Sequence, residues 1–434
     1  MPIRFHLPEH RALASTLLRW CLLGAWVGVL AGCASAFFLT ALSWATEYRE
    51  AHPAILWGLP VAGAGIAWLY GRFGKLAAGG NNLILEHIHH PQGWVPFRMA
   101  PLILVTTVLT HLFGGSAGRE GTAVQMAGSL ADAATRPLRL SRPERRLLLM
   151  SAISGGFGSV FGTPLAGMVF GLEVLSVGRL RYDALVPCFV ASYVGDVICR
   201  AWGVQHHHYL VGPVPSLTPW LVLLVVFSGL LFGATSFLFA ECTDEVQRVM
   251  QSRVTRAWLR PVLGGSAVVA LTYALGTRDY LGLGIPLIER SFSAEGVFVG
   301  AFALKLLFTA VTLGSGFKGG EVTPLFCIGA TLGAAIAQLT GQPTGFFAAL
   351  GFVAVFAGAA NTPLACVLMG IELFGSALGV PLATACIVSY VISGHRGIYL
   401  SQQVDTAKAP GLAFPKGSTL REVREGWPWD EPGE

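Results

Sequence analysis

The chain has 434 residues, of which 53% are hydrophobic and only 12% are charged. An ordinary soluble domain carries roughly 25% charged residues, so this composition excludes a soluble protein and predicts an all-α, polytopic membrane protein. The net charge of +5 comes from basic residues in short segments between apolar stretches, which indicates membrane topology and not nucleic-acid binding.

Apolar stretches follow one another along the chain, and about 20 apolar residues are needed for a helix to cross a bilayer. The stretches are 15–45, 54–70, 99–113, 146–176, 184–202, 218–240, 262–276, 296–314, 322–339 and 345–393. Several are too short or too rich in glycine to be plain spanning helices, so we expect broken and re-entrant helices. We divide the chain into a cytoplasmic N-terminus, a first transmembrane repeat, a second repeat and a cytoplasmic tail: 1–14, 15–205, 206–400 and 401–434.

Two glycine-rich segments, each with a glutamate, occupy corresponding places in the two halves. Gly118–Arg119–Glu120–Gly121–Thr122 opens one apolar helix, and Gly319–Gly320–Glu321–Val322–Thr323–Pro324 opens another. About forty residues after each comes a Thr–Pro–Leu–Ala block, which ends in Glu173 in the first half and in Glu372 in the second. Glycine-broken apolar segments at matching places in two halves indicate an ion site in the middle of the membrane. For Glu173 and Glu372 themselves we expect structural hydrogen bonds.

The distribution of basic residues indicates that the two halves are inverted. Lys and Arg are in excess in cytoplasmic loops, which predicts that four basic clusters face the cytosol: Arg4, Arg11 and Arg19; Arg72 and Lys75; Arg136, Arg139, Arg142, Arg145 and Arg146; and Arg248, Arg253, Arg256 and Arg260. Shifted by the repeat offset of 201 residues, the five-arginine loop 136–146 falls on 337–347, which has no charged residue. The copies are therefore expected to point in opposite directions, with their glycine-rich helix starts tip to tip.

Such helix starts are suited to an anion. A helix N-terminus presents unpaired N–H groups and a partial positive charge, so it attracts an anion without a buried lysine. The carboxylate of Glu120 could occupy the anion position itself when ionised and leave it when protonated, which would couple anion movement to protons. An ionisable residue within the membrane is a functional hypothesis by default, although Glu321 could also serve merely as a helix cap.

These motifs resemble those of the chloride-channel (CLC) superfamily of anion channels and anion/proton antiporters. Its Gly–Lys/Arg–Glu–Gly–Pro motif corresponds to Gly118–Thr122, which makes Glu120 similar to the family's gating glutamate. Tyr399, in Gly397–Ile398–Tyr399–Leu400, stands where the anion-coordinating tyrosine of the family lies. The resemblance covers nearly the whole chain and implies an inverted-topology repeat and a homodimer with one ion pathway in each subunit.

Three departures from the chloride-selective members resemble the fluoride/proton antiporter branch. The Gly–Ser–Gly–Ile–Pro motif, whose serine contacts the central anion, is replaced by Gly80–Asn81–Asn82–Leu83–Ile84. Gly–x–Phe–x–Pro is replaced by Gly320–Glu321–Val322–Thr323–Pro324, and the internal proton-transfer glutamate by Val174. In that branch the residues that match Glu321 and Thr323 are implicated in proton and fluoride handling. Amide N–H groups such as those of Asn81 and Asn82 can also donate directly to a small, strongly hydrated anion, although either residue could instead cap a helix.

We therefore expect a secondary active transporter of the bacterial inner membrane, with both termini cytoplasmic, that exports fluoride in exchange for protons and gives fluoride resistance. The alternative is a chloride/proton exchanger or chloride channel of the same fold. Glu120, Glu321 and Thr323 are the expected gating and proton-handling residues. The expected anion-binding residues are Asn81, Asn82, Gly118, Arg119, Glu120, Gly121, Glu321, Val322 and Tyr399. Fluoride, protons and lipid are the expected partners, besides the second subunit; no cofactor, metal or nucleic acid is expected.

Two other interpretations of the sequence have weaker support. His87, His89 and His90, like His206, His207 and His208, resemble metal clusters, but no Asp, Cys or Glu stands near them at ligand spacing. Ser116 among small residues, with His111 or His395 as a general base, would fit an intramembrane hydrolase. That interpretation leaves the duplicated glutamates unexplained, so we expect no enzyme.

Overall fold

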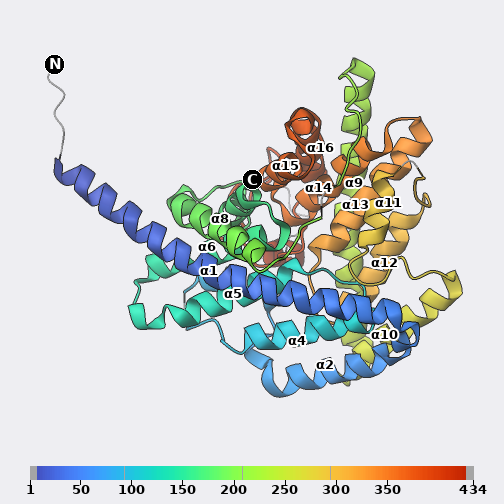
Figure 1. Cartoon of the computed structure of the whole chain (residues 1–434), viewed down its shortest axis with the longest axis horizontal. Helices are drawn as coiled ribbons and strands as arrows, with labels where there is room; N and C mark the ends of the chain where they lie inside the picture. The colour runs from blue at the N-terminus through green and yellow to red at the C-terminus, as the bar shows by residue number, and fades with distance from the viewer. Residues whose placement is uncertain (1–6, 92, 208, 294, 427–434) are drawn as a thin grey trace.

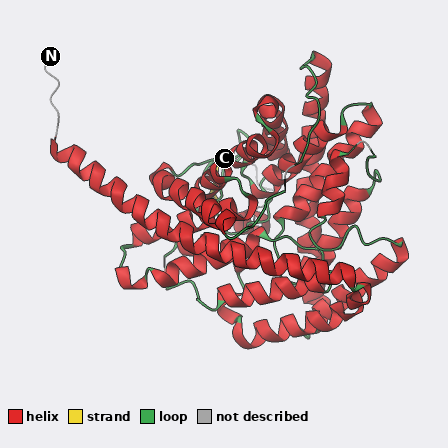
Figure 2. Ribbon diagram, in the orientation of Figure 1, coloured by secondary structure: helices red, strands yellow, loops and turns green. Residues whose placement is uncertain are grey.

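A computed structural model describes residues 7–91, 93–207, 209–293 and 295–426. Arg4, His208 and the last eight residues of the predicted tail lie outside this part of the chain. Within it the protein is almost entirely helical (Figure 2). Two short strands, β1 (Ser176–Val177) and β2 (Gln403–Val404), pair in parallel.

The helices form two series of eight, followed by a short helix near the C-terminus. The first series is α1 (Leu7–Ala51), α2 (Leu59–Phe73), α3 (Gly80–His89), α4 (Met99–Leu112), α5 (Glu120–Ala134), α6 (Arg142–Phe161), α7 (Pro164–Glu173) and α8 (Leu185–Ala201). The second is α9 (Pro219–Arg253), α10 (Leu259–Leu275), α11 (Ile285–Phe292), α12 (Ala301–Gly314), α13 (Val322–Thr340), α14 (Thr344–Ala360), α15 (Pro363–Phe374) and α16 (Gly379–Ile392). Helix α17 (Leu420–Gly426) comes last.

The two series pack in the same way. Helix α1 lies against α6 and α8, as α9 lies against α14 and α16, and the α4–α5 contact is repeated by α12–α13. The first series fills much of the lower left of Figure 1 and the second much of the upper right. Helices α5 and α13, where the glutamate motifs begin, are mostly buried, so the repeat places both motifs in the interior of the protein. The all-helical, duplicated architecture that the sequence motifs predict is therefore present.

Two apolar stretches that look continuous in the sequence are interrupted in the structure. The stretch 146–176 breaks between α6 and α7, where Gly162 has φ 72°, and 345–393 breaks between α14 and α15, where Asn361 has φ 56°. Both residues adopt the left-handed conformation that ends helices, and a Thr–Pro pair then starts the next helix in each half. The expected broken helices are thus confirmed, although hydropathy alone did not locate these two breaks.

Long apolar helices support a membrane location. Within the described residues, five helical segments are long and apolar enough to span a bilayer: Glu9–Ala51, Pro53–Phe73, Tyr182–Ala201, Pro219–Arg253 and Val322–Thr340. The other apolar helices are shorter, and large apolar side chains such as Leu22 on α1 and Leu223 on α9 are exposed on the protein surface. Exposed apolar residues on this scale indicate contact with lipid, and the protein is a multi-pass membrane protein.

The two halves are joined by a reciprocal pair of carboxylates. Glu173, at the end of α7, accepts hydrogen bonds from the backbone N–H groups of Leu364 and Ala365 at 3.1 and 2.9 Å. Glu372, on α15, accepts from Leu165 and Ala166 at 2.9 and 2.8 Å. Each carboxylate therefore satisfies the first free N–H groups of the matching helix in the other half, where a negative charge is favoured. The structural hydrogen bonds expected for these glutamates are present.

Replacing Glu372 with Gln is expected to destabilise the protein. The glutamine side chain has one acceptor oxygen, so one of the two N–H groups loses its partner, which costs about 0.5–1.5 kcal/mol for these partly exposed hydrogen bonds. A larger loss, about 1–3 kcal/mol, is expected for Glu173→Gln, because Glu173 and its hydrogen bond to Ala365 are buried. Thermal unfolding of the purified variants measures both, with Glu47→Gln, an exposed position, as the control. Equal stability of all three variants would contradict a joining role for these carboxylates.

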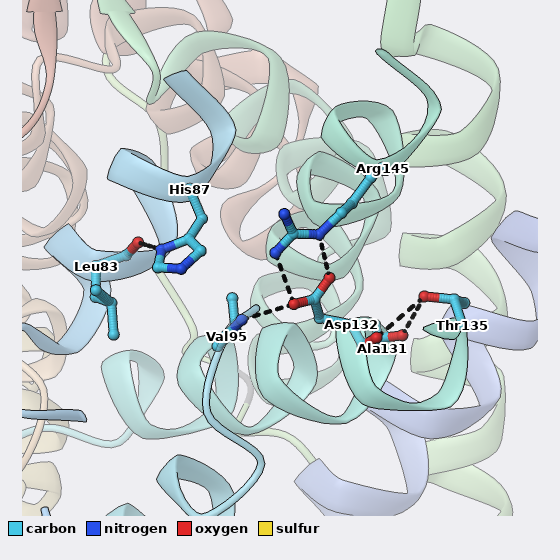
Figure 3. Close-up of polar contacts among 7 residues, drawn as sticks. All are labelled: Leu83, His87, Val95, Ala131, Asp132, Thr135 and Arg145. Atoms are coloured by element: carbon cyan, nitrogen blue, oxygen red, sulfur yellow. Dashed lines mark hydrogen bonds and ion pairs between the residues drawn. The ribbon is translucent and has the colours of Figure 1, made fainter. Parts of the chain in front are cut away.

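The five-arginine loop is anchored by one buried ion pair. Nε and Nη2 of Arg145 donate to the two carboxylate oxygens of Asp132 at 2.6 and 2.8 Å, and the N–H of Val95 donates to the same carboxylate at 2.7 Å (Figure 3). The Arg145 guanidinium also lies 4.7 Å from the ring centroid of Trp94. Such a bidentate pair with further hydrogen bonds compensates for the burial of both charges. Arg145 is therefore a structural residue of this loop.

The described part of the C-terminal tail is docked on the membrane domain. Strand β2 pairs with β1 of the first half, and Arg424 of α17 forms ion pairs with Glu241 and Asp244 of α9. The polar composition of residues 401–434 gives no sign of this docking. Its consequence is that the segment after Tyr399 is fixed against the first half and α9.

Candidate functional site

The two glutamate motifs meet in the interior of the protein. Gly118 donates its N–H to the carbonyl of Gly320 at 2.6 Å, and Gly320 donates to the carbonyl of Gly118 at 2.8 Å. This antiparallel bridge holds the start of α5 against the start of α13. The segments that carry Glu120 and Glu321, 201 residues apart in the chain, are therefore neighbours, as the inverted repeat predicts.

The side chain of Glu120 lies at the N-terminus of α13. Its Oε2 accepts hydrogen bonds from the N–H groups of Thr323 at 3.1 Å and Arg119 at 3.2 Å, while Oε1 accepts from the hydroxyl of Thr323. The residue is only 1% exposed. The carboxylate thus occupies a position where backbone donors from both motifs converge, which is where the helix dipole favours a negative charge.

Glycine is needed on both sides of this carboxylate. A Cβ atom on Gly118 would lie 2.7 Å from Oε2 of Glu120, and one on Gly320 would lie 2.9 Å from the same oxygen. Both distances are too short for a methyl group. The close approach of the two backbones therefore leaves room for the carboxylate, or for a small anion in its place, and for little else.

Glu321 faces a separate space beside this position. It is the N-cap residue of α13, but its side chain makes no capping hydrogen bond, so it does not serve as a helix cap. It lines a cavity of about 160 Å³ together with Asn81, Asn82, Lys318 and Tyr399. A half-buried acid that is not used for capping is available for binding or proton transfer.

The two asparagines of the α3 start have different surroundings, and neither is the N-cap, which is Gly79. Oδ1 of Asn82 accepts a hydrogen bond from the N–H of Ser401 at 3.0 Å, which fixes the segment that follows Tyr399. The side chain of Asn81 lies next to Gly121, where a Cβ atom would be 2.9 Å from Nδ2. Its Oδ1 is buried and has no hydrogen-bond partner among the described residues. The oxygen of Asn81 is therefore not committed to another residue, whereas the oxygen of Asn82 is bonded to Ser401.

Tyr399 is held in place by residues on both sides of it. The N–H of Ile398 donates to the carbonyl of Ala359 at 2.9 Å. The amide of Gln402, which is fully buried, donates to the carbonyls of Val174 and Ala360 at 3.0 and 3.2 Å. Tyr399 lines the 160 Å³ cavity and also a much smaller space that it shares with Asn81 and Val174. The buried tyrosine thus lies between the start of α3 and the position of Val174.

Lys305 is a buried cation that our sequence reasoning missed. It lies in α12, is fully buried, and donates from Nζ to Ser116 Oγ at 2.9 Å and to the carbonyls of Tyr280 and Gly282 at 3.1 and 2.8 Å. These three acceptors satisfy all three donors of the ammonium group. The sequence does contain a sign of this buried cation, because Lys305 is a single charged residue within the apolar stretch 296–314. It places a positive charge beside the segment that leads to Gly118.

A second cavity lies near the start of α2, whereas the Glu321 cavity lies near the end of that helix. It has a volume of about 250 Å³ and is lined by Arg49, Glu50, Arg278 and Asp279, among others. It also includes Pro53 and Leu56, just before α2, whereas the Glu321 cavity includes Tyr70, near the end of α2. Cavities that include charged side chains therefore lie near both ends of the spanning helix α2.

The two weaker interpretations of the sequence find no matching geometry in the described residues. Ser116 Oγ contacts Lys305 and Thr309, whereas His111 Nε2 lies 3.4 Å from the carbonyl of Gly118 and His395 Nε2 accepts from the N–H of Lys408. In the part of the chain that the structure describes, no three His, Cys, Asp or Glu residues gather as metal ligands. His208, from one of the two histidine groups, lies outside that part.

Comparisons with known proteins agree on one family. The family model described as voltage gated chloride channel matches residues 62–394. The chain is similar to a chloride/fluoride channel protein of Pseudomonas syringae pv. tomato, with 51% identity over 93% of this chain and 91% of that protein. It is similar to the solved structure of a CLC-type fluoride/proton antiporter, with a TM-score of 0.87 and 35% identity over 90% of this chain and 98% of that one. The structure of a slow cyanobacterial Cl⁻/H⁺ antiporter shares the fold, with a TM-score of 0.75 and 20% identity over 86% of this chain and 94% of that one.

Proposed function

Because this chain belongs to the voltage-gated chloride channel (CLC) family, we propose that it is a secondary active transporter that exports fluoride from the cytoplasm in exchange for protons. The observation that carries the proposal is the carboxylate of Glu120, bonded to the N–H of Thr323 at the N-terminus of α13. The carboxylate and the transported anion would use the same position, so only one of them can occupy it at a time. Protonation of Glu120 removes its charge, frees the position and links the two ions.

The residues around this position support fluoride as the anion. Fluoride is small and strongly hydrated, so its site must supply hydrogen-bond donors at short range, and the Asn81 amide group offers two such donors. Fluoride is also basic enough to share a proton with a nearby acid, which Glu321 supplies. The similarity to a chloride/fluoride channel protein and to a fluoride/proton antiporter supports the same choice.

In this proposal the anion is bound along the line from the Glu321 cavity to the Glu120 position. Glu120 gates the pathway, and Glu321 and Thr323 assist the transfer of protons and fluoride. Asn82 contributes mainly by fixing the segment around Tyr399, and Lys305 makes the interior more favourable for an anion. The anion-binding set is Asn81, Asn82, Gly118, Arg119, Glu120, Gly121, Glu321, Val322 and Tyr399.

The proposal includes a cellular setting. The transporter lies in the bacterial inner membrane as a homodimer with one pathway per subunit, both termini are cytoplasmic, and the repeats comprise residues 15–205 and 206–400. Hydrogen fluoride enters as a neutral acid and dissociates in the more alkaline cytosol. Inward protons then drive the export of the trapped fluoride, which gives resistance to fluoride and involves no enzymatic reaction.

A flux assay with two anions tests this function. Liposomes that contain the protein are loaded with fluoride or chloride, and efflux is followed with ion-selective electrodes while proton uptake is followed by external pH. Fluoride efflux is expected to exceed chloride efflux by at least about tenfold, equal to about 1.4 kcal/mol in barrier height. Proton uptake should accompany the fluoride efflux. Equal rates for the two anions would instead identify a chloride-type exchanger or channel of the same fold.

A further inference from the structure

A basic cavity lies outside the ion pathway, where α3 ends and α6 begins. It has a volume of about 330 Å³ and is lined by His89, Arg142, Arg146, Arg181 and Asp183, with Ile88, Pro91, Pro143 and Leu147 completing its wall. A volume of this size falls at the lower end of the range for small-molecule sites, roughly 300–1,000 Å³. The cavity is about twice as large as the one that contains Glu321, and therefore suits a polyatomic ligand better than a single halide.

The arginines of this cavity are not all neutralised. Arg181 pairs with Asp183 at 3.1 Å, and Arg179, two residues earlier, pairs with Asp405 at 3.6 Å. Neither Arg142 nor Arg146 has an ion-pair partner in the described part of the chain. With three arginines and one aspartate in its lining, the cavity has a formal net charge of +2.

Arg146 has an unused donor in addition to its charge. Its Nε is buried and has no hydrogen-bond partner among the described residues. The adjacent Arg145 differs, since its Nε and Nη2 are both bonded to Asp132 (Figure 3). Arg146 as a whole is only half-buried and lines the cavity, so the accessible part of its guanidinium, which has no hydrogen-bond or ion-pair partner in the described part of the chain, is available to a ligand there.

The nearby carboxylate of Glu144 does not supply an acceptor to Arg146. It accepts hydrogen bonds from the N–H and hydroxyl of Ser141 at 2.8 and 2.7 Å, and it pairs with Arg19 at 2.6 Å. Guanidinium groups bind phosphate through two parallel hydrogen bonds, with a fit that a lysine cannot provide. We propose that this cavity binds a phosphate-bearing anion, either the headgroup of an anionic phospholipid or free phosphate, through Arg142 and Arg146.

Ligand-dependent stability tests the proposal on the full-length protein. Thermal unfolding is measured in detergent with inorganic phosphate against chloride at equal ionic strength, and separately in phosphatidylcholine nanodiscs with and without phosphatidylglycerol. The double variant Arg142→Gln/Arg146→Gln is expected to weaken the stabilising ligand's apparent affinity by at least about tenfold. The control is Arg253→Gln/Arg256→Gln, which removes two exposed arginines from the basic segment 248–260.

Each outcome has a defined meaning. Stabilisation by phosphate identifies the free ion as a ligand, and stabilisation by phosphatidylglycerol alone identifies a lipid headgroup, provided that the cavity variant loses the effect and the control keeps it. No stabilisation by either ligand, or equal loss in both variants, would overturn the proposal. If the double variant does not fold, the single variant Arg142→Gln replaces it, because Arg142 is exposed and its removal leaves the packing of α6 intact.

Discussion

Replacing Glu120 with Gln is expected to abolish proton coupling. The glutamine side chain has nearly the same shape and can still lie at the N-terminus of α13, but it neither carries a negative charge nor binds and releases a proton. In liposomes with a fluoride gradient and no proton gradient, uphill proton movement should fall by about 100-fold or more, equal to about 2.7 kcal/mol in barrier height. Movement of fluoride down its own gradient should remain measurable, because the backbone donors that hold the anion are unchanged.

Glu372→Gln is the matched control for this experiment. Glu372 is also a glutamate that accepts two backbone N–H groups at a helix start, but its hydrogen bonds join α15 to α7 and none of them involves the glutamate motifs. Its replacement should lower stability and leave the proton-to-fluoride ratio unchanged. Uphill proton movement that persists in Glu120→Gln would remove Glu120 as the gate.

The sequence predicted the elements that depend on repetition. The copies of the glycine-glutamate motif and of the Thr–Pro–Leu–Ala block show that two halves share one pattern, and the contrast between the arginine loop 136–146 and the uncharged 337–347 predicts that the halves are inverted. From these observations alone the helix starts at Glu120 and Glu321 should meet. In the structure the two helix starts meet at the backbone bridge between Gly118 and Gly320.

Hydropathy could not locate the breaks in the long apolar stretches. An apolar stretch is recognised by averaging over many residues, whereas the break between α6 and α7 consists of Gly162 and Thr163 alone. Asn361 and Thr362 make the same break in the second half. In both places the break is marked only by a residue in the left-handed conformation followed by Thr–Pro. Hydropathy averaged over 20 residues does not detect such a short feature.

Other features depend on neighbours that are remote in the sequence. Asn81 and Asn82 are adjacent and chemically identical, yet Asn82 is bonded to Ser401, a residue 319 positions away. Only the three-dimensional structure distinguishes them. Lys305 is different, because a single lysine in an apolar stretch is visible in the sequence, while its partners Ser116, Tyr280 and Gly282 come from two separate segments.

Replacing Gly320 with Ala should block transport while the fold is retained. The φ of Gly320 is not positive, so the backbone itself accepts an alanine. The added Cβ, however, would lie 2.9 Å from both Oε2 of Glu120 and the backbone N of Gly121. The methyl group would therefore take the space in which the carboxylate and the anion alternate.

The expected result is a fall in both fluoride and proton flux of about tenfold or more, equal to about 1.4 kcal/mol or more in barrier height, because the methyl group takes space that the carboxylate and the anion need. Initial rates of fluoride efflux from liposomes measure it, and size-exclusion chromatography checks the fold. Gly65→Ala is the matched control, because no atom lies within 4 Å of the Cβ position on that α2 residue. Gly118→Ala should behave like Gly320→Ala, since its Cβ would approach the same oxygen from the other half at 2.7 Å. Normal flux in both of these variants would mean that the ion does not pass between the two glycines, and the pathway would have to be placed elsewhere.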